Sequence, residues 1–216
     1  MIRSALSVIA PKIKQLAFVH RYGGLAKTVT RSIAVNEDFN IFENQKFPVT
    51  SDTSVSECWE DGRYLQLCPN DRYASVVFFE EVNGMSFDGY SEQRSGRRRF
   101  PVFSGQARLV AWLNYQELGL DETEYSDMFA LSFIGAINSE YTQIKSPLIF
   151  NRLQFSVSNV EPQSSNPFSK YSFSDIERLL LYPYGYVSMI VDIQAELSPK
   201  CFDGVDVLNP IECVEY

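Results

Sequence analysis

Histidine is almost missing from this chain, because His20 is the only one among 216 residues. A nucleophilic triad with a histidine base therefore has one candidate base, and no G-x-S-x-G nucleophile elbow accompanies it. The cysteines Cys58, Cys68, Cys201 and Cys213 form no C-x-x-C pair, which excludes the usual spacing of a zinc site. We expect His20 to have a structural or surface role and the cysteines to be reduced thiols, with two disulfides as the alternative in an oxidising compartment.

Nucleotide-binding loops and long apolar runs are missing as well. Neither G-x-x-x-x-G-K-[ST] nor G-x-G-x-x-G occurs, and no glutamate stands two positions before a lysine, as the common E-x-K nucleases need. The apolar stretch from Ala5 to Ala10 stops at Pro11, well short of the roughly 20 residues of a spanning helix. No convincing secretory signal is present. We therefore predict no cofactor, no membrane span and a cytoplasmic location when the protein is made.

The composition is that of a globular protein, with 45% hydrophobic and 21% charged residues. The formal charge of -8 is unevenly distributed. Residues 1–108 hold 14 Lys and Arg against 12 Asp and Glu, whereas residues 109–216 hold 5 against 15. The cations that precede the first acid, Glu37, are Arg3, Lys12, Lys14, Arg21, Lys27 and Arg31. One end of the chain is therefore basic and the remainder acidic.

The hydrophobic pattern predicts an N-terminal helix, a central helix and a short helix before the C-terminal strand. The first helix runs from about Pro11 to Tyr22, with an extension toward Met1 left open, because proline suits the first helical position. The central helix runs from about Gly105 to Leu118. The short helix runs from Ser174 to about Leu181 and opens on capping-box spacing. Residues 128–137 could be helix or strand.

Runs of β-branched and aromatic residues, or strict alternation, predict the strands. Those strands are Lys27–Val35, Tyr64–Cys68, Ala74–Val82, Phe100–Phe103, Leu153–Val157 and Val187–Leu197. Asn83-Gly84 is a turn signal. Since the helices do not alternate regularly with the strands, we predict an α+β fold with a mostly antiparallel sheet. It forms a single domain over 1–216, with an exposed loop or hairpin tip near 89–99 and a C-terminal tail from about 198.

An arginine cluster is the sharpest local feature of the sequence. Arg94, Arg97, Arg98 and Arg99 place four guanidinium groups within six positions. Such a group can hold phosphate or a partner's carboxylates. Three interpretations stay open: a solvated tip, a protein-protein contact, or a nucleic-acid contact through the tip or a ring lumen, although a net acidic chain disfavours the last.

Further candidate interface residues come from the basic start and from a tyrosine-rich turn. We expect the cations Lys12, Lys14 and Arg21 to lie on the exposed side of the first helix. The tyrosines around Pro183 are Tyr182, Tyr184 and Tyr186. They can be core residues, or interface anchors with a large contact area.

Pairs of carboxylates are the remaining candidates for chemistry. Two acids can serve as general acid and base or hold a divalent cation. Glu80 and Glu81 are adjacent on a predicted strand and should point to opposite faces. The acids between Glu57 and Asp61, and between Asp121 and Asp127, fit solvated turns. A carboxylate-dependent hydrolase using Glu57, Glu60 and Asp61 is nevertheless the alternative enzymatic interpretation.

These features together favour a non-enzymatic subunit of a homo-oligomeric, ring-like assembly, in which a basic patch meets the acidic surface of the next copy. In the order of its predicted elements, from Pro11 to Leu197, the chain resembles ring-forming neck or tail-completion proteins of tailed phages. The resemblance implies a virion component that contacts copies of itself and other structural proteins, and it assigns no functional residue. A monomeric binding module that uses the arginine tip is the third interpretation.

Overall fold

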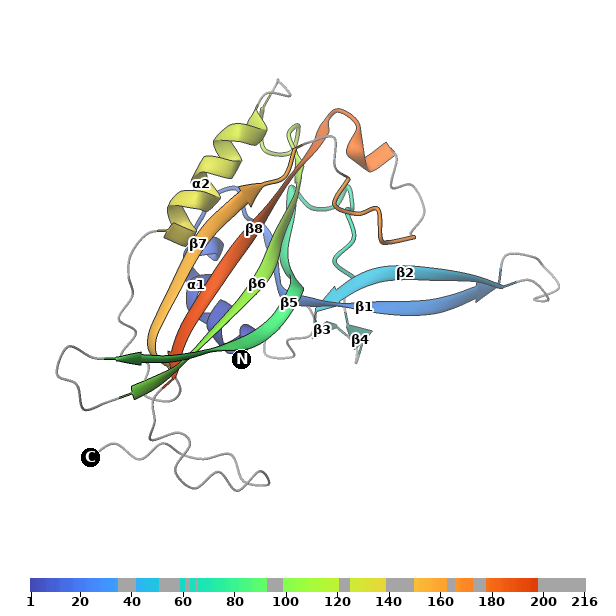
Figure 1. Ribbon diagram of the computed structural model, residues 1–216. Helices are drawn as coiled ribbons and strands as arrows, with labels where there is room; N and C mark the ends of the chain where they lie inside the picture. Colours follow the sequence, from blue (N-terminus) through green and yellow to red (C-terminus); the bar gives the residue numbers. More distant parts are fainter. Residues whose placement is uncertain are drawn as a thin grey trace.

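The structure is a computed structural model, and it describes residues 1–34, 42–50, 59–60, 63–64, 66–92, 99–120, 125–138, 150–162, 166–172 and 178–197. Within these residues two α-helices accompany a six-stranded, mostly antiparallel sheet (Figure 1). The predicted combination of helices with such a sheet is confirmed, and so is an N-terminal helix. No helix in the described part of the chain is long and apolar enough to cross a membrane.

The main sheet has the strand order β2-β1-β5-β6-β8-β7. Neighbouring strands are antiparallel except β1 and β5, which are parallel. The bounds are β1 Arg21–Ala34, β2 Phe42–Thr50, β5 Ser75–Glu92, β6 Arg99–Asn114, β7 Phe150–Val160 and β8 Tyr184–Leu197. A separate small sheet pairs β3 (Trp59–Glu60) with β4 (Arg63–Tyr64).

The first helix, α1, spans Ile2–Lys14, so the extension toward Met1 that the sequence left open is present, whereas the predicted continuation to Tyr22 is wrong. An apolar stripe decides its position, and the buried residues of that stripe are Ile2, Ala5, Leu6, Ile9 and Ile13. Pro11 inside the helix costs about 3 kcal/mol. Burying a single Ile or Leu contributes about 1.5–3 kcal/mol, so several of them outweigh the proline. The chain is already a strand from Arg21 onward.

The predicted helix from Gly105 to Leu118 is also wrong, because most of this segment belongs to β6. Leu109 and Leu113 are buried in a core under the helices, whereas Val110 and Trp112 are buried in a second core on the other face of the sheet. Because both faces of this part of β6 are covered, its sequence is an almost continuous apolar run. Such a run cannot be told from a buried helix by periodicity alone.

The segment that the sequence left undecided, residues 128–137, is helical: α2 spans Ser126–Asn138. Its inner side packs on the sheet and on the chain that follows α1. The ring of Phe18 contacts Phe129 and Phe133 edge-to-face, with centroids 4.6 and 5.2 Å apart. Aromatic pairs in this geometry add about 0.5–1.5 kcal/mol to the burial of their area.

Most predicted strands are confirmed, with shifted ends: Lys27–Val35 overlaps β1, Ala74–Val82 β5, Phe100–Phe103 β6, Leu153–Val157 β7 and Val187–Leu197 β8. The predicted strand Tyr64–Cys68 is reduced to the end of β4 and a single bridge at Gln66. The predicted turn at Asn83-Gly84 is wrong, since β5 continues through it with shifts of register that absorb the irregularity.

Two further expectations fall partly outside the described residues. The short helix predicted from Ser174 to Leu181 contains a 3-10 turn at Arg178–Leu180, and residues 173–177 are not described. At the expected tip near 89–99, Glu92 of β5 pairs with Arg99 of β6, and residues 93–98 are not described. The expected tail from 198 onward lies outside the described residues.

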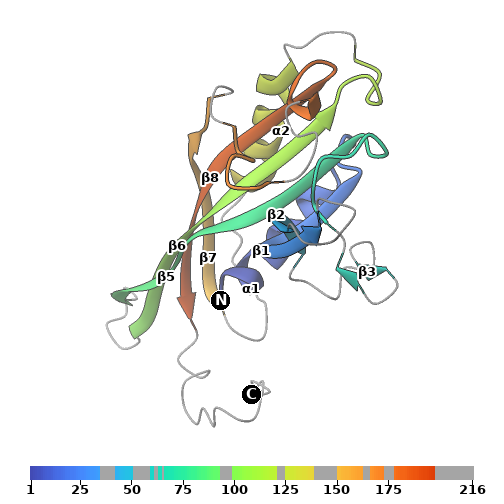
Figure 2. The ribbon, with the colours of Figure 1, turned by 90° about the vertical axis from the view of Figure 1, so that its right-hand side faces the viewer.

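The two faces of the sheet are covered differently. Helices α1 and α2 cover the inner face over the larger core, and Figure 2 shows them behind the strands. On the outer face, side chains from the segments 66–74, 166–172 and 178–181 cover one end of the sheet and enclose the smaller core. We call this covered end the closed half and the remainder of the outer face the open half.

Strands β1 and β2 continue past the sheet as a two-stranded arm, which extends away from the body in Figure 1. We use "arm" for residues 27–32 and 44–46. Residues 27–32 are exposed at every position. Since successive side chains of a strand point to opposite faces, both faces of the arm are open there.

Candidate functional site

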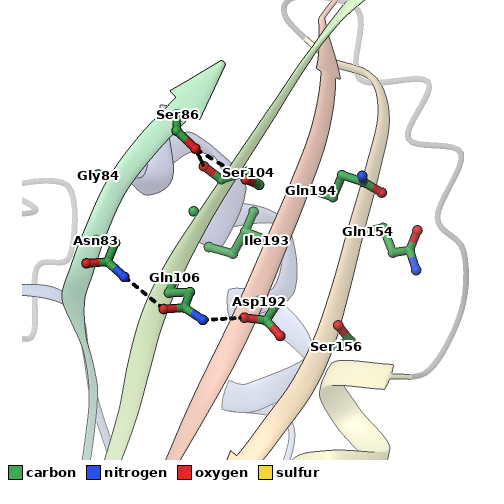
Figure 3. Close-up of a pocket in the computed structure, with 11 residues that line it drawn as sticks. Asn83, Gly84, Ser86, Ser104, Gln106, Gln154, Ser156, Asp192, Ile193 and Gln194 are labelled. Carbon is green, nitrogen blue, oxygen red and sulfur yellow. Dashed lines mark hydrogen bonds between the residues drawn. The ribbon is translucent and has the colours of Figure 1, made fainter. Parts of the chain in front are cut away.

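The open half of the outer face carries a field of small polar side chains. Neighbouring strands place them in two rows: Asn83, Gln106, Asp192 and Ser156 form one, and Ser86, Ser104, Gln194 and Gln154 form the other. Each row crosses β5, β6, β8 and β7 in turn, with every residue directly opposite the next. Together the eight line a hollow of about 400 Å³, which we call the polar trough (Figure 3).

Side-chain hydrogen bonds fix half of the first row. The Asn83 amide donates to Gln106 Oε1 over 2.9 Å, and Gln106 Nε2 donates to Asp192 Oδ1 over 2.8 Å. This chain crosses three strands and is visible as the dashed lines in Figure 3. In the second row, the hydroxyls of Ser86 and Ser104 lie 3.3 Å apart. The β5 and β6 side of the trough is thus internally bonded.

The opposite side of the trough is chemically unsatisfied. The side chains of Gln154, Gln194 and Ser156 make no hydrogen bond with any described residue. Asp192 accepts from Gln106 through one oxygen and has no cationic partner within the described residues. Asp88, which contacts Ser86 at 3.4 Å on the rim, also lacks one there. The trough therefore offers two carboxamides, a hydroxyl and the Asp192 carboxylate to a bound partner, and the Asp88 carboxylate lies beside it at Ser86.

A charged cluster separates the trough from the closed half. Glu80 is 3% exposed and faces Lys170 Nζ at 2.7 Å and Arg108 NH1 at 3.8 Å. Arg108 NH2 also donates to Glu161 Oε1 over 2.9 Å, and Glu161 accepts from the hydroxyl of Ser188. A buried carboxylate is costly unless it is paired, and the two cations pair with the Glu80 charge where polar and apolar surface meet.

Tyr171 completes the charged cluster by donating its phenol hydrogen to Glu80. Burial, followed by the nearby charge of Glu80, raises the pKa of the Tyr171 phenol far above its ordinary value. The phenol is therefore a neutral donor at physiological pH. The prediction that Glu80 and Glu81 face opposite sides is confirmed, since Glu81 is exposed.

The described residues offer little for covalent or metal chemistry. They contain no group of three or more His, Cys, Asp or Glu side chains placed to hold a metal ion. His20 is exposed, and its backbone amide donates to Ser75 Oγ over 2.8 Å. Burial raises the pKa of the Cys68 thiol to about 12, which keeps it protonated and unreactive. Of the alternative acids, Glu57 and Asp61 lie outside the described residues, and Glu60 belongs to β3.

The predicted basic residues that the structure describes belong to three different elements. Arg94, Arg97 and Arg98 lie outside the described residues, and Arg99 begins β6. Lys12 and Lys14 lie in the last turn of α1, where Lys14 Nζ is 5.6 Å from the centroid of the Tyr22 ring. The expectation that Arg21 is exposed on the first helix is wrong. It is a buried residue of β1, and its guanidinium lies 4.4 Å from the Tyr73 ring centroid.

The predicted tyrosines have different environments. Tyr184 stacks on Trp112 with ring centroids 5.2 Å apart, and its hydroxyl donates to Asp71 over 2.6 Å. Tyr186 is half-buried against the smaller core. Tyr182, by contrast, is 60% exposed, so of the three it has the largest surface to offer to a partner.

The trough residues were not singled out from the sequence. Their types are ordinary for an exposed strand, and Gln106 and Asp192 stand 86 positions apart. The only available signal was the alternation in β8, which puts Asp192 and Gln194 on the polar side. Comparison of the chain with models of known families and with curated proteins finds no match, so its function has to be inferred from its own residues.

Proposed function

We propose that this protein is a non-enzymatic structural subunit that associates with copies of itself into a ring-like assembly. The observation that carries the proposal is the arm. A two-stranded ribbon is at best marginally stable alone in water. An arm with both faces exposed is therefore well suited to be covered by a neighbouring molecule, in the way that projecting hairpins link subunits.

Exposed apolar side chains away from the arm support the same proposal. On the outward side of α2, Leu131 is 68% and Met128 49% exposed, although the inward side of this helix is buried. A helix that is apolar on all sides is normally covered on all sides. On the extension of the β5 and β6 hairpin, Phe87 and Tyr90 are 53% and 62% exposed. Such surface is typical of protein-protein contacts.

The charge distribution favours contacts between unlike surfaces of neighbouring copies. Lys27, Arg31 and Lys46 all belong to the arm, so the basic start of the sequence becomes a basic projection. The second half of the chain is strongly acidic. A heterologous contact of this kind repeats from copy to copy and closes into a ring when the rotation permits. A place in a phage virion, at the neck or tail, is the more specific form of this proposal, and it rests on the resemblance of the predicted elements, of which the helix from Gly105 to Leu118 is in fact strand β6.

Sedimentation velocity of the full chain tests the proposal. We expect a species of several times 24.7 kDa at low salt, which dissociates in part at about 1 M salt, where the Debye length falls to about 3 Å. A single 24.7 kDa species at every concentration would overturn the proposal and favour the monomeric binding module.

The arginine tip provides a second test by the same measurement. Changing Arg97, Arg98 and Arg99 together to glutamate should weaken self-association, or docking to another structural protein, while the circular dichroism spectrum stays that of the folded protein. Unchanged sedimentation and unchanged partner binding would remove the tip from the interface and leave it as a solvated loop.

A further inference from the structure

We infer that the arm of one copy docks into the polar trough of the next copy. This inference rests on the proposed self-association and names the two surfaces that meet. It makes the contact heterologous, because the arm and the trough are different parts of the molecule. Each copy would then use its arm on one neighbour and its trough on the other.

Hydrogen-bonding capacity is complementary between the two surfaces. The side chains of Gln154, Gln194 and Ser156 in the trough have no hydrogen-bond partner among the residues that the structure describes. The arm exposes the Thr30 hydroxyl and the Asn44 amide in return, and the Asn44 oxygen already accepts from the Ser32 hydroxyl over 2.7 Å within the arm. An ordinary antiparallel sheet can have one face exposed to water without binding a partner, so polar side chains alone do not indicate a binding surface. A hollow of about 400 Å³ lined by amides is instead shaped to accept polar side chains from another surface.

Charge is complementary as well. Residues 27–32 and 44–46 contain three cations, Lys27, Arg31 and Lys46, and no acid. The trough holds the Asp192 carboxylate, and Asp88 stands at its rim, both without a cationic partner in the described part of the chain. Docking would therefore bring cations to carboxylates that no described cation of the same copy neutralises, which favours this partner over an acidic one.

The width of the two-stranded arm fits the width of the trough. Four adjacent strands span about 14 Å, because neighbours are about 4.8 Å apart, and a ribbon of two strands is narrower than that. The trough extends over four strands, so the arm can lie on it as a second layer, much as sheets pack face to face at about 10 Å.

The arm of a copy is directed away from its own trough. Ser172 binds its second strand: Lys46 N donates to Ser172 Oγ and Ser172 N donates to Lys46 O, each over 2.8 Å, and Ser172 Oγ donates to Asn44 O over 3.3 Å. From this anchor the arm runs outward from the body of the molecule (Figure 1). A fixed, outward-pointing arm can reach the trough of a neighbour but not its own.

Two complementary variants test the inference. The arm variant carries Lys27→Glu and Arg31→Glu, and the trough variant carries Gln154→Lys and Gln194→Lys. All four positions lie at the surface or are half-buried, so both proteins should fold. Because like charges then face each other, each variant alone should show an apparent Kd at least about tenfold higher than the wild-type chain. Native mass spectrometry and sedimentation velocity measure this effect.

Mixing the two variants gives the sharper result. A mixture still contains one intact trough, on the arm variant, and one intact arm, on the trough variant. It should therefore assemble again, because the intact arm meets the intact trough and the altered arm, now acidic, meets the altered trough, now basic. A mixture that stays monomeric, or variants that assemble as the wild-type chain does, would overturn the docking of arm into trough.

Matched controls carry the same charge changes elsewhere on the surface. The variant Arg3→Glu with Arg72→Glu corresponds to the arm variant, and Gln15→Lys with Gln116→Lys corresponds to the trough variant. All four positions are exposed and lie outside both surfaces. The controls should assemble normally, and loss of assembly in them would show that net charge, not the docking contact, is responsible. A monomeric wild-type chain would instead overturn the proposed function itself.

Discussion

The closed and open halves of the outer face are built on the same strands but have opposite chemistry. In the closed half, β5 and β6 present Phe78, Val110 and Trp112, and neighbouring segments cover them completely. In the open half the same two strands present Asn83 and Gln106, and no described segment covers them. A single strand can therefore be a core element at one end and a recognition surface at the other, with the Glu80 cluster marking the change.

The largest loss of stability should come from a substitution of Trp112 in the closed half. It is fully buried in the closed half, stacks on Tyr184 and donates from Nε1 to the Leu179 carbonyl over 2.7 Å. Trp112→Ala should lower the free energy of unfolding by about 3–5 kcal/mol, because it leaves a large cavity. Urea unfolding followed by circular dichroism measures this. A loss below about 1 kcal/mol would mean that the closed half is not a true core.

A substitution in the charged cluster between the two halves should lower the free energy of unfolding by a smaller amount. Tyr171→Phe removes the hydrogen bond to Glu80 but keeps the ring in the smaller core. Because the acceptor is a buried carboxylate, we expect a loss of about 1.5–3 kcal/mol in the same unfolding experiment. Tyr90→Phe, which removes a phenol hydroxyl at an exposed position of β5, is a suitable control and should change stability by about 0.5 kcal/mol or less.

Alkaline pH should lower the stability of the folded protein through Tyr171 in the same cluster. The pKa of Tyr171 is raised in the folded protein, so the unfolded state ionises first as the pH rises. The stabilisation from the neutral phenol is then fully present below the unfolded pKa of about 10 and is lost at higher pH. The thermal midpoint should fall above that pH in the wild-type chain and fall less steeply in Tyr171→Phe. Equal slopes would show that Tyr171 does not titrate differently on folding.

The smallest effect should come from the open half. Gln106 lies on β6 six positions before Trp112, on the same face, and connects Asn83 to Asp192. Gln106→Ala should lower the stability of the isolated chain by about 1 kcal/mol or less, since water replaces the lost hydrogen bonds. A loss comparable to that of Trp112→Ala, in the same urea titration, would abolish the distinction between the two halves.

The sequence predicts one half of this comparison better than the other. Strand β8 was recognised because its outer side chains are polar at the open end, so that Asp192 and Gln194 alternate visibly with apolar residues. Strand β6 was mistaken for a helix because its outer side chains become apolar at Trp112 and the alternation disappears. Local pattern reports a strand only where one face meets water.

The polar trough could not be predicted from the pattern of residues within single segments. It exists because register places Asn83 opposite Gln106 and Gln106 opposite Asp192, and register depends on long-range pairing that no single segment encodes. The basic start of the chain was recognised, but its cations were assigned to a helix. In the structure Lys27 and Arg31 belong to the arm, and Arg21 is buried. The number of cations in a segment can be counted from the sequence even when its secondary structure is mispredicted, whereas the place of each cation on the surface cannot.

Hydrogen exchange at two protein concentrations tests the central claim most directly. Peptides that cover residues 27–32 of the arm and 192–196 of β8 are compared above and below the concentration at which the chain dissociates. We predict that both sets of amides exchange at least about tenfold more slowly in the assembled protein, while helix α1 exchanges equally in both states. Equal exchange of the arm and the trough at the two concentrations would contradict the claim that a neighbouring copy covers them.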